Sequence, residues 1–281
     1  MSGSMVQFIR KIKNDKVGFF GLIGVLLIVI IGVLAPLIAP YGPEEMIKEH
    51  RLEAPGMKFW LGTDDLGRDI FSRIVYGAQV SLMVGLISVG IGATFGMFFG
   101  LIAGYFQGLV DNIIMRCMDV LFAFPDLLLA LAIVAVLGPS LRNTMIAIGL
   151  VLIPVFTRLV RSSVISIKET EYIENAQSIG ASNTRIILKH LAPNVMAPFL
   201  VQVTLALSTA VLAEASLSFL GLGIQPPDPS WGSMLNTSRR FMEAAPWTAI
   251  APAVFIIFTI FCFNLLGDSL RDIFDPRLDN Q

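Results

Sequence analysis

Three acidic side chains lie inside long apolar stretches, and they are the first candidates for chemistry in this sequence: Asp119, Asp126 and Glu214. A carboxylate at membrane depth costs a few kcal/mol unless it faces protein or water, so we expect these groups to look inward. Asp119 and Asp126 are seven residues apart and would share one face of a continuous helix. Each of the three either lines a solute pathway or serves as a structural hydrogen-bond acceptor, Asp126 for backbone groups freed at Pro125.

Residues for covalent, metal or nucleotide chemistry are few. Both histidines, His50 and His190, lie outside the apolar stretches, so an intramembrane hydrolase would lack a base at helix depth. Two cysteines without a CxxC or HExxH pattern predict no disulfide framework and no metal site. The Asp-rich run 64–69 lacks the alternating ligands and distal Glu of a calcium loop. No GxxxxGK[ST] loop is present to hold nucleotide phosphates, so we expect neither an enzyme nor a cofactor in this chain.

A polar segment, Glu171–Pro193, interrupts the apolar second half of the chain. Ile173, Ala176, Gln177 and Gly180 follow helical spacing, which predicts a short helix with one small, flat face. Gly180 permits a sharp turn after it. Ser182 can then cap a second helix that ends before Pro193. The sequence therefore predicts a compact helix-turn-helix unit between two apolar spans, and the alternative is a passive solvated loop.

The composition predicts an all-α, polytopic membrane protein. Hydrophobic residues make up 55% of the 281 residues, charged residues 15%, and the mean hydropathy is +0.75. A soluble domain would carry charge on about a quarter of its residues. The formal net charge of −1 gives no reason to expect nucleic acid as a partner. The expected partner along the apolar surface is membrane lipid.

About six transmembrane helices are expected, all in one domain that covers residues 17–281. A spanning helix needs about 20 apolar residues. The segments that qualify are 17–39, 79–104, 113–137, 144–165, 195–220 and 247–267. Between the second and third of them we expect a short turn over 105–116. Pro154 is expected to kink the fourth.

Charge sets the expected orientation of these spans. Residues 1–16 are basic and should stay in the cytoplasm, which makes the first span an uncleaved anchor. An even number of spans then places both termini inside. Loops 41–77 and 221–246 should face outside, whereas loop 166–194, which contains the polar segment, should face the cytoplasm.

The first outer loop ends in a motif that predicts a helix start. Asp64 or Asp65 is expected to cap a helix in which Ile70, Phe71, Ile74 and Val75 form an apolar face. Asp69 and Arg73 are spaced to pair across one turn. An amphipathic helix of this kind suits the membrane surface.

Glycines recur at every fourth position of the second span, at Gly92, Gly96, Gly100 and Gly104. Small residues at this spacing allow another helix to approach closely. We interpret the stripe as a packing surface rather than a binding site.

Four stretches together resemble the permeases of ABC importers. Glu174, Ala176, Gly180 and Pro193 match the cytoplasmic "EAA" loop, although Asn175 and Ala192 depart from it. Three more stretches are similar to the dipeptide, oligopeptide and nickel branch: 61–73, 214–232 and 264–277. Within them, the motif positions are Gly62, Thr63, Asp64, Gly67, Arg68, Asp69, Trp231, Gly232, Gly267, Asp268, Arg271 and Asp272.

The resemblance implies a type I ABC importer transmembrane domain in a prokaryotic inner membrane, here the C-type permease. It also implies a heterodimer with a second, homologous permease, two ABC ATPase subunits that bind ATP and Mg, and an extracytoplasmic substrate-binding protein. ATPase coupling would then involve the following loop residues: Glu171, Tyr172, Ile173, Glu174, Ala176, Gln177, Gly180 and Ala181.

Other substrates and mechanisms remain open at this stage. The expected cargo is a di- or oligopeptide, and the alternatives are nickel or another small solute. Few histidines and scattered methionines argue against a metal pathway, although a chelated metal would need no ligands from the pore. An ion-coupled secondary transporter would have to build its ion site from Asp119, Asp126 or Glu214, and it would need no docking loop.

Overall fold

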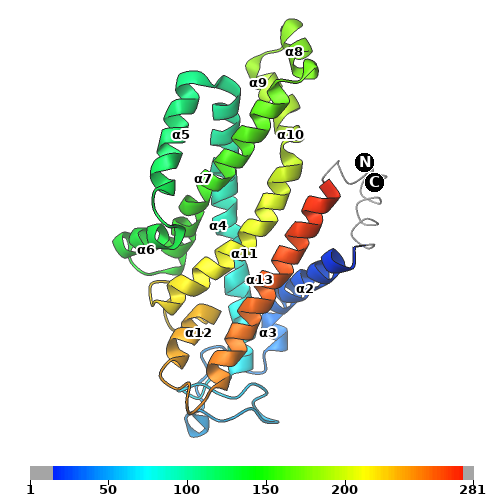
Figure 1. Cartoon of the computed structure of the whole chain (residues 1–281). Coiled ribbons are helices and arrows are strands. Elements are labelled where there is room, and N and C mark those ends of the chain that lie inside the picture. Colours follow the sequence, from blue (N-terminus) through cyan, green and yellow to red (C-terminus); the bar gives the residue numbers. More distant parts are fainter. Residues whose placement is uncertain (1–14, 275–281) are drawn as a thin grey trace.

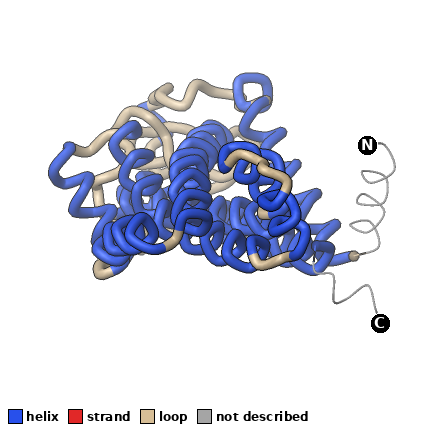
Figure 2. Tube along the Cα trace, turned by 90° about the horizontal axis from the view of Figure 1, so that it is seen from above, coloured by secondary structure: helices blue, strands red, loops and turns tan. Residues whose placement is uncertain are grey.

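The computed structural model describes residues 15–274, and in this part of the chain helices alternate with loops and no strand forms (Figures 1 and 2). Residues 1–14 and the motif residues beyond 274 lie outside the described residues. Five helices are long and apolar enough to cross a membrane: α2 (Lys16–Val33), α4 (Ile70–Phe106), α7 (Leu141–Lys168), α11 (Met196–Phe219) and α13 (Trp247–Phe274). A sixth span results if α5 (Gly108–Phe122) and α6 (Asp126–Leu137) count together. The expectation of an all-helical protein with about six spans is confirmed.

Shorter helices complete the described chain. They are α3 (Ala35–Ile38) after the first span, the 3-10 turn η1 (Lys48–His50), and α12 (Trp231–Ser238) within the loop 221–246. The polar segment contains α8 (Glu171–Ser178), α9 (Asn183–Arg185), the π-turn η2 (Ile186–Leu191) and α10 (Ala192–Asn194). The loops 41–69 and 221–246 lie at one end of the molecule, whereas α8 and α9 lie at the other (Figure 1). The two predicted outer loops thus lie together, at the end opposite to the polar segment.

The second span begins earlier than the sequence indicated. Residues 70–106 form one helix of 37 residues, about 55 Å long, so the separate surface helix was wrong. Asp69, not Asp64 or Asp65, is its N-cap and accepts the Ser72 backbone N–H at 2.8 Å. Ile70, Ile74 and Val75 do share an apolar face, but that face is buried against protein. No proline interrupts residues 70–106, so the helix continues into the span.

The third predicted span is broken. α5 and α6 meet at an angle of 87° at the break around Ala123–Pro125, and α5 already begins at Gly108, where a turn was expected. Asp119 and Asp126 therefore lie on different helices, and the prediction that they share one face was wrong. Pro125 sits just before α6, where a missing backbone N–H costs little.

The glycine stripe of α4 packs against α7. A Cβ atom added to Gly92, Gly96, Gly100 or Gly104 would lie 2.2–2.7 Å from the Cβ atoms of Leu152, Phe156, Val160 and Val164 respectively. Both series rise in steps of four, so the two helices run parallel with their backbones in close approach. Gly149 of α7 makes the same kind of close contact in the other direction, because a Cβ atom added to it would lie 2.8 Å from the Ile91 Cβ atom of α4. The interpretation of the stripe as a packing surface is confirmed.

Two buried clusters hold the remaining helices. The larger one surrounds the α4–α7 pair and extends into the polar segment through Ile173, Ile186 and Leu191. The smaller one joins α2, α12 and α13 to the ends of α4 and α11 around Trp231, whose indole N–H donates to the Ile74 carbonyl oxygen at 3.0 Å. The α4–α7 pair therefore connects one end of the molecule mechanically to the other.

Candidate functional site

The polar segment folds as the sequence predicted, from local signals. Gly180 has a φ of +81°, and its N–H donates to the Gln177 carbonyl oxygen at 2.9 Å. The Ala181 N–H reaches back to the Ala176 carbonyl oxygen at 3.1 Å, which completes a Schellman-type end to α8. Ser182 then caps α9 through the Arg185 N–H at 3.4 Å. Glycine is favoured at position 180 because a left-handed backbone strains other residues.

The free face of α8 differs from the predicted one. Ile173 is fully buried and Ala176 is 7% exposed, because both pack toward the chain's own residues. The outward side instead presents Tyr172, which is 55% exposed, and Ile179, which is 86% exposed. Ile173 and Ala176 of the predicted face therefore form an internal contact, whereas Gln177 and Gly180 are exposed. Sequence reasoning missed Ile179. The feature that could have identified it is a large apolar side chain in an otherwise polar segment.

A shallow hollow of about 350 Å³ lies beside this outward face. Tyr172, Asn175, Ile179 and His190 line it, together with Gly180 and Arg185. The Tyr172 hydroxyl contacts the His190 Nδ1 atom, and the two rings meet edge to face at 5.1 Å. Glu171 and Glu174 are exposed on the first turn of α8, and Gln177 is exposed on its second. This end of the molecule thus offers an apolar rim, formed by Tyr172 and Ile179, with acidic neighbours on the first turn of α8.

Direct bonds connect the polar segment to the α4–α7 pair. The Tyr105 hydroxyl donates to the Asn183 Oδ1 atom at 2.8 Å. Lys168 donates to the Tyr105 carbonyl oxygen at 2.8 Å, from the last residue of α7. A force applied to α8 would therefore reach two helices whose backbones are in close contact.

The acidic residues of the broken span have separate partners. Asp119 is exposed and pairs with Arg158 of α7 at 2.8 Å, and that guanidinium lies 3.8 Å from the Phe122 ring centroid. Asp111, which the sequence analysis did not single out, accepts two bonds from Arg161 at 2.5 and 2.6 Å. The sequence analysis missed Asp111 because it predicted a turn over residues 105–116. The two pairs hold α5 against α7.

Asp126 and Glu214 occupy opposite environments. Asp126 is exposed at the first position of α6 and lines an apolar pocket of about 200 Å³ with Ile148, Leu152 and Leu212. Glu214 is fully buried in α11 and accepts the Ser218 hydroxyl proton at 2.7 Å, while its Oε2 atom has no partner in the described part of the chain. Asp126 is thus open to a solute, whereas Glu214 lies inside the helix packing.

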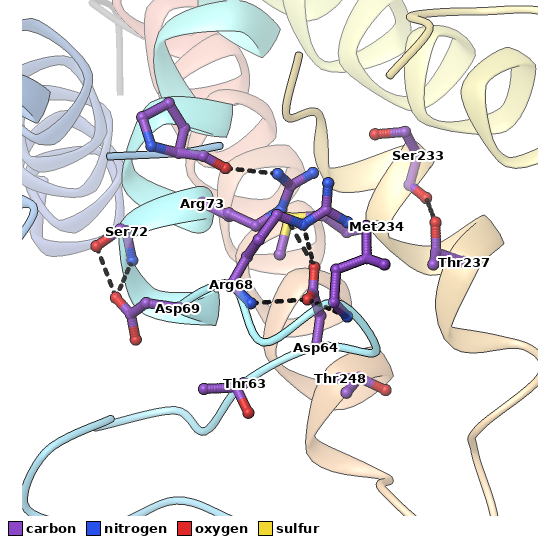
Figure 3. A network of polar contacts seen from close by, with 12 residues as sticks. Thr63, Asp64, Arg68, Asp69, Ser72, Arg73, Ser233, Met234, Thr237 and Thr248 are labelled. Atoms are coloured by element: carbon purple, nitrogen blue, oxygen red, sulfur yellow. Dashed lines mark hydrogen bonds and ion pairs between the residues drawn. The ribbon is translucent and has the colours of Figure 1, made fainter. Parts of the chain in front are cut away.

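The motif 62–69 organises the outer loop around Asp64 (Figure 3). Its Oδ1 atom accepts the backbone N–H groups of Leu66 and Arg68 at 2.9 Å each, and its Oδ2 atom accepts Arg68 Nε at 2.6 Å. Thr63 accepts the Glu53 N–H at 2.9 Å. The predicted Asp69–Arg73 pair was wrong, because Asp69 caps α4 and Arg73 donates to the Pro43 carbonyl oxygen at 2.6 Å instead.

Several motif glycines mark close contacts rather than chemistry. Added Cβ atoms would lie 2.2 Å from the Ile47 carbonyl oxygen at Gly67, 2.4 Å from the Ala215 carbonyl oxygen at Gly232, and 2.5 Å from Leu205 at Gly267. Gly62 has a φ of +78°. Asp268, Arg271 and Asp272 lie in the last turns of α13, where Arg271 borders a groove of about 420 Å³ between α7, α11 and α13.

Comparisons with known proteins agree with this geometry. The family described as "Binding-protein-dependent transport system inner membrane component" matches residues 96–280, and "N-terminal TM domain of oligopeptide transport permease C" matches residues 4–55. The dipeptide transport system permease protein DppC of Alkalihalophilus pseudofirmus is 48% identical over 96% of this chain and 88% of that protein. The glutathione transport system permease protein GsiD of Escherichia coli is 45% identical over 97% of this chain and 90% of that protein.

Solved structures share the fold at low identity. The MetNI methionine ABC transporter, in inward-facing conformations, aligns with a TM-score of 0.59 at 17% identity, over 72% of this chain and 97% of that chain. A crystal structure of an amino acid ABC transporter with histidines aligns with a TM-score of 0.56 at 15% identity, over 70% and 92%. At these identities the likeness concerns the arrangement of the helices.

Proposed function

Because this chain belongs to the family of binding-protein-dependent transport system inner membrane components, the permeases of ABC importers, we propose that it forms half of a peptide pathway driven by separate ATPase subunits. It is a multi-pass protein of the inner membrane and works with ATPase and substrate-binding partners. The observation that carries the proposal is the exposed Tyr172–Ile179 rim, fixed at the end of the α4–α7 pair.

The proposed mechanism is mechanical. ATP and Mg bind to the ATPase subunits, and closure of those subunits moves α8. The loop is bonded to Tyr105 through Asn183, and Tyr105 is bonded to Lys168 of α7, so movement of the loop passes into the α4–α7 pair as a unit. The break between α5 and α6 supplies a point where the pathway wall bends. This chain contributes the docking surface and part of the wall, and it performs no hydrolysis itself.

The proposed assembly is a heterodimer of this chain with a second, homologous permease. Support comes from the broken span, because α5 and α6 leave large apolar side chains exposed: Leu109 is 80% exposed and Val136 is 85% exposed. Lipid covers such residues in part. Asp126 lies on the same helix as Val136, and a carboxylate at that depth requires water or protein beside it.

Orientation can be tested by labelling. We propose that both termini and the polar segment face the cytoplasm. Single cysteines at Glu49 and Asp228, in a background lacking Cys117 and Cys262, should react with an impermeant maleimide from outside. A cysteine at Thr184 should react only after the membrane is permeabilised. All three positions are exposed, whereas Ser230 is fully buried as the cap of α12 and would be a poor reporter. If only the cysteine at position 184 were labelled on sealed cells, the proposed orientation would be wrong and the topology would be the inverse.

We propose that the cargo is a short peptide, because the relatives described above are a dipeptide and a glutathione transport permease. The competing cargo is nickel, the other branch of the resemblance. Within residues 15–274, no group of three His, Cys, Asp or Glu side chains is placed to hold a metal. We expect the importer reconstituted with its partners to accumulate radiolabelled dipeptide and no nickel.

The same uptake assay separates the mechanisms. Dipeptide uptake should require ATP on the side of the membrane where the ATPase subunits bind. It should stop when ATP is replaced by a non-hydrolysable analogue. Uptake that persists without the ATPase subunits, driven by an ion gradient, would establish a secondary transporter. Import of nickel without dipeptide import would establish the metal branch.

A further inference from the structure

A polar cavity of about 260 Å³ lies at the outer end of the molecule, between the loop that precedes α4 and the segment that joins α11 to α12. Arg68 and Arg73 line it, together with Asp228, Asn236 and Thr237. Pockets for drug-sized ligands have roughly 300–1,000 Å³. The cavity therefore suits a smaller solute with hydrogen-bonding groups.

The two arginines are buried and incompletely paired. Arg68 is 6% exposed and Arg73 is 5% exposed. Arg68 Nε lies 2.6 Å from Asp64 Oδ2, and Arg73 Nε lies 3.8 Å from the same oxygen. Among the described residues, no hydrogen bond or ion pair occupies the two Nη atoms of Arg68. Figure 3 shows both guanidinium groups on one side of Asp64, with Ser233 and Thr237 of α12 nearby.

The shared carboxylate leaves donor capacity for a second one. Asp64 already accepts two backbone N–H groups, so it does not satisfy both guanidiniums. A guanidinium binds a carboxylate through its planar fork of N–H donors, and burial strengthens such a bond. A carboxylate that entered the cavity would reduce the repulsion between two neighbouring cations.

The cavity wall also carries negative charge. Asp228 is exposed and has no hydrogen-bond partner among the described residues. Asp65 has a buried Oδ1 atom without a partner in the same part of the structure. A solute that satisfies both arginines and an aspartate must carry one carboxylate and one cation. A short peptide with free ends is such a solute.

We propose that this cavity is an outer binding site for a short zwitterionic peptide, whose carboxylate contacts Arg68 and Arg73 and whose ammonium contacts Asp228. The inference rests on the proposed peptide transport and gives the motif residue Arg68 a role in it. The site lies at the end opposite to α8, where the binding protein would release its cargo (Figure 1).

The test is protection of a reporter cysteine. Thr237→Cys, in a background with Cys117 replaced, is placed in the assembled importer without binding protein and labelled with N-ethylmaleimide. Dialanine at about ten times its Kd should slow labelling roughly tenfold, following simple occupancy. Dialanine amide, which lacks the carboxylate, and N-acetyl-dialanine, which lacks the ammonium, should protect far less.

Two variants identify the residues involved. Arg68→Gln should abolish protection, whereas Arg240→Gln, an exposed arginine at the same end outside the cavity, should retain it. Since Arg68 also holds the loop, Asp228→Asn provides a variant that breaks no hydrogen bond in the described residues. It should weaken protection by dialanine and leave protection by N-acetyl-dialanine unchanged.

Three outcomes would overturn the inference: no protection by dialanine, equal protection by dialanine amide, or protection that appears only with the binding protein present. Dipeptide uptake is measured on the same preparation after reconstitution with the binding protein and ATP. Intact uptake without protection would reject the cavity as a binding site and leave the proposed transport function standing. Absent uptake would reject the proposed transport function itself.

Discussion

Ile179→Asp is expected to abolish transport while the permease still accumulates in the membrane. Ile179 is 86% exposed, directly before Gly180, and nothing in the chain's own packing depends on it. Loss of an apolar anchor at an interface centre costs about 2 kcal/mol or more, which corresponds to more than a tenfold loss of affinity. We expect uptake to fall at least about tenfold and the ATPase subunits to be lost on purification, because the docking rim then carries a charge.

The matched variant is Ile179→Leu, which retains an apolar side chain of similar volume and should transport normally. An exposed substitution changes folding stability by less than about 0.5 kcal/mol, so both proteins should reach the same membrane level. Uptake is measured at equal expression. Normal transport by Ile179→Asp would remove α8 from the coupling mechanism.

The polar segment could be predicted from sequence because its signals are local. Gly180 ends α8 and Ser182 begins α9 through bonds that span fewer than six residues. The free face could not be predicted in the same way. It depends on which side meets Ile186 and Leu191, and periodicity does not reveal which partner a face has.

The errors at the outer end and in the third span have non-local causes. Spacing suggested that Arg73 would pair with Asp69, yet Arg73 reaches Pro43, 30 residues earlier in the chain. Asp69 was already committed to capping α4. Hydropathy across α5 and α6 passes as one span, and composition contains no information about the 87° bend between them. The glycine stripe predicted a close contact between helices, but only the structure identified α7 as the partner helix.

Gly96→Leu is expected to be the most destabilising single change in the α4–α7 pair. A Cβ at Gly96 would lie 2.2 Å from Phe156 Cβ and 3.1 Å from the Ile153 carbonyl oxygen, so the two helices would have to separate. Overpacking of this kind costs about 1–3 kcal/mol or more, and helices in lipid depend on close packing rather than on the hydrophobic effect.

Gly90→Leu is the matched control, because it lies on the same helix and a Cβ there meets nothing within 4 Å. The two variants share the same loss of backbone freedom and the same added side chain, so their difference isolates the contact with α7. At about 2–4 °C per kcal/mol for a chain of this size, Gly96→Leu should lower the unfolding midpoint in detergent by roughly 2–12 °C relative to Gly90→Leu. Because the polar segment is bonded to the same pair through Asn183 and Tyr105, Gly96→Leu should also reduce the ATPase stimulation that substrate-loaded binding protein produces, even in the protein that remains folded. Equal midpoints for the two variants would show that α4 and α7 tolerate separation, and the pair could then not transmit movement from one end of the molecule to the other.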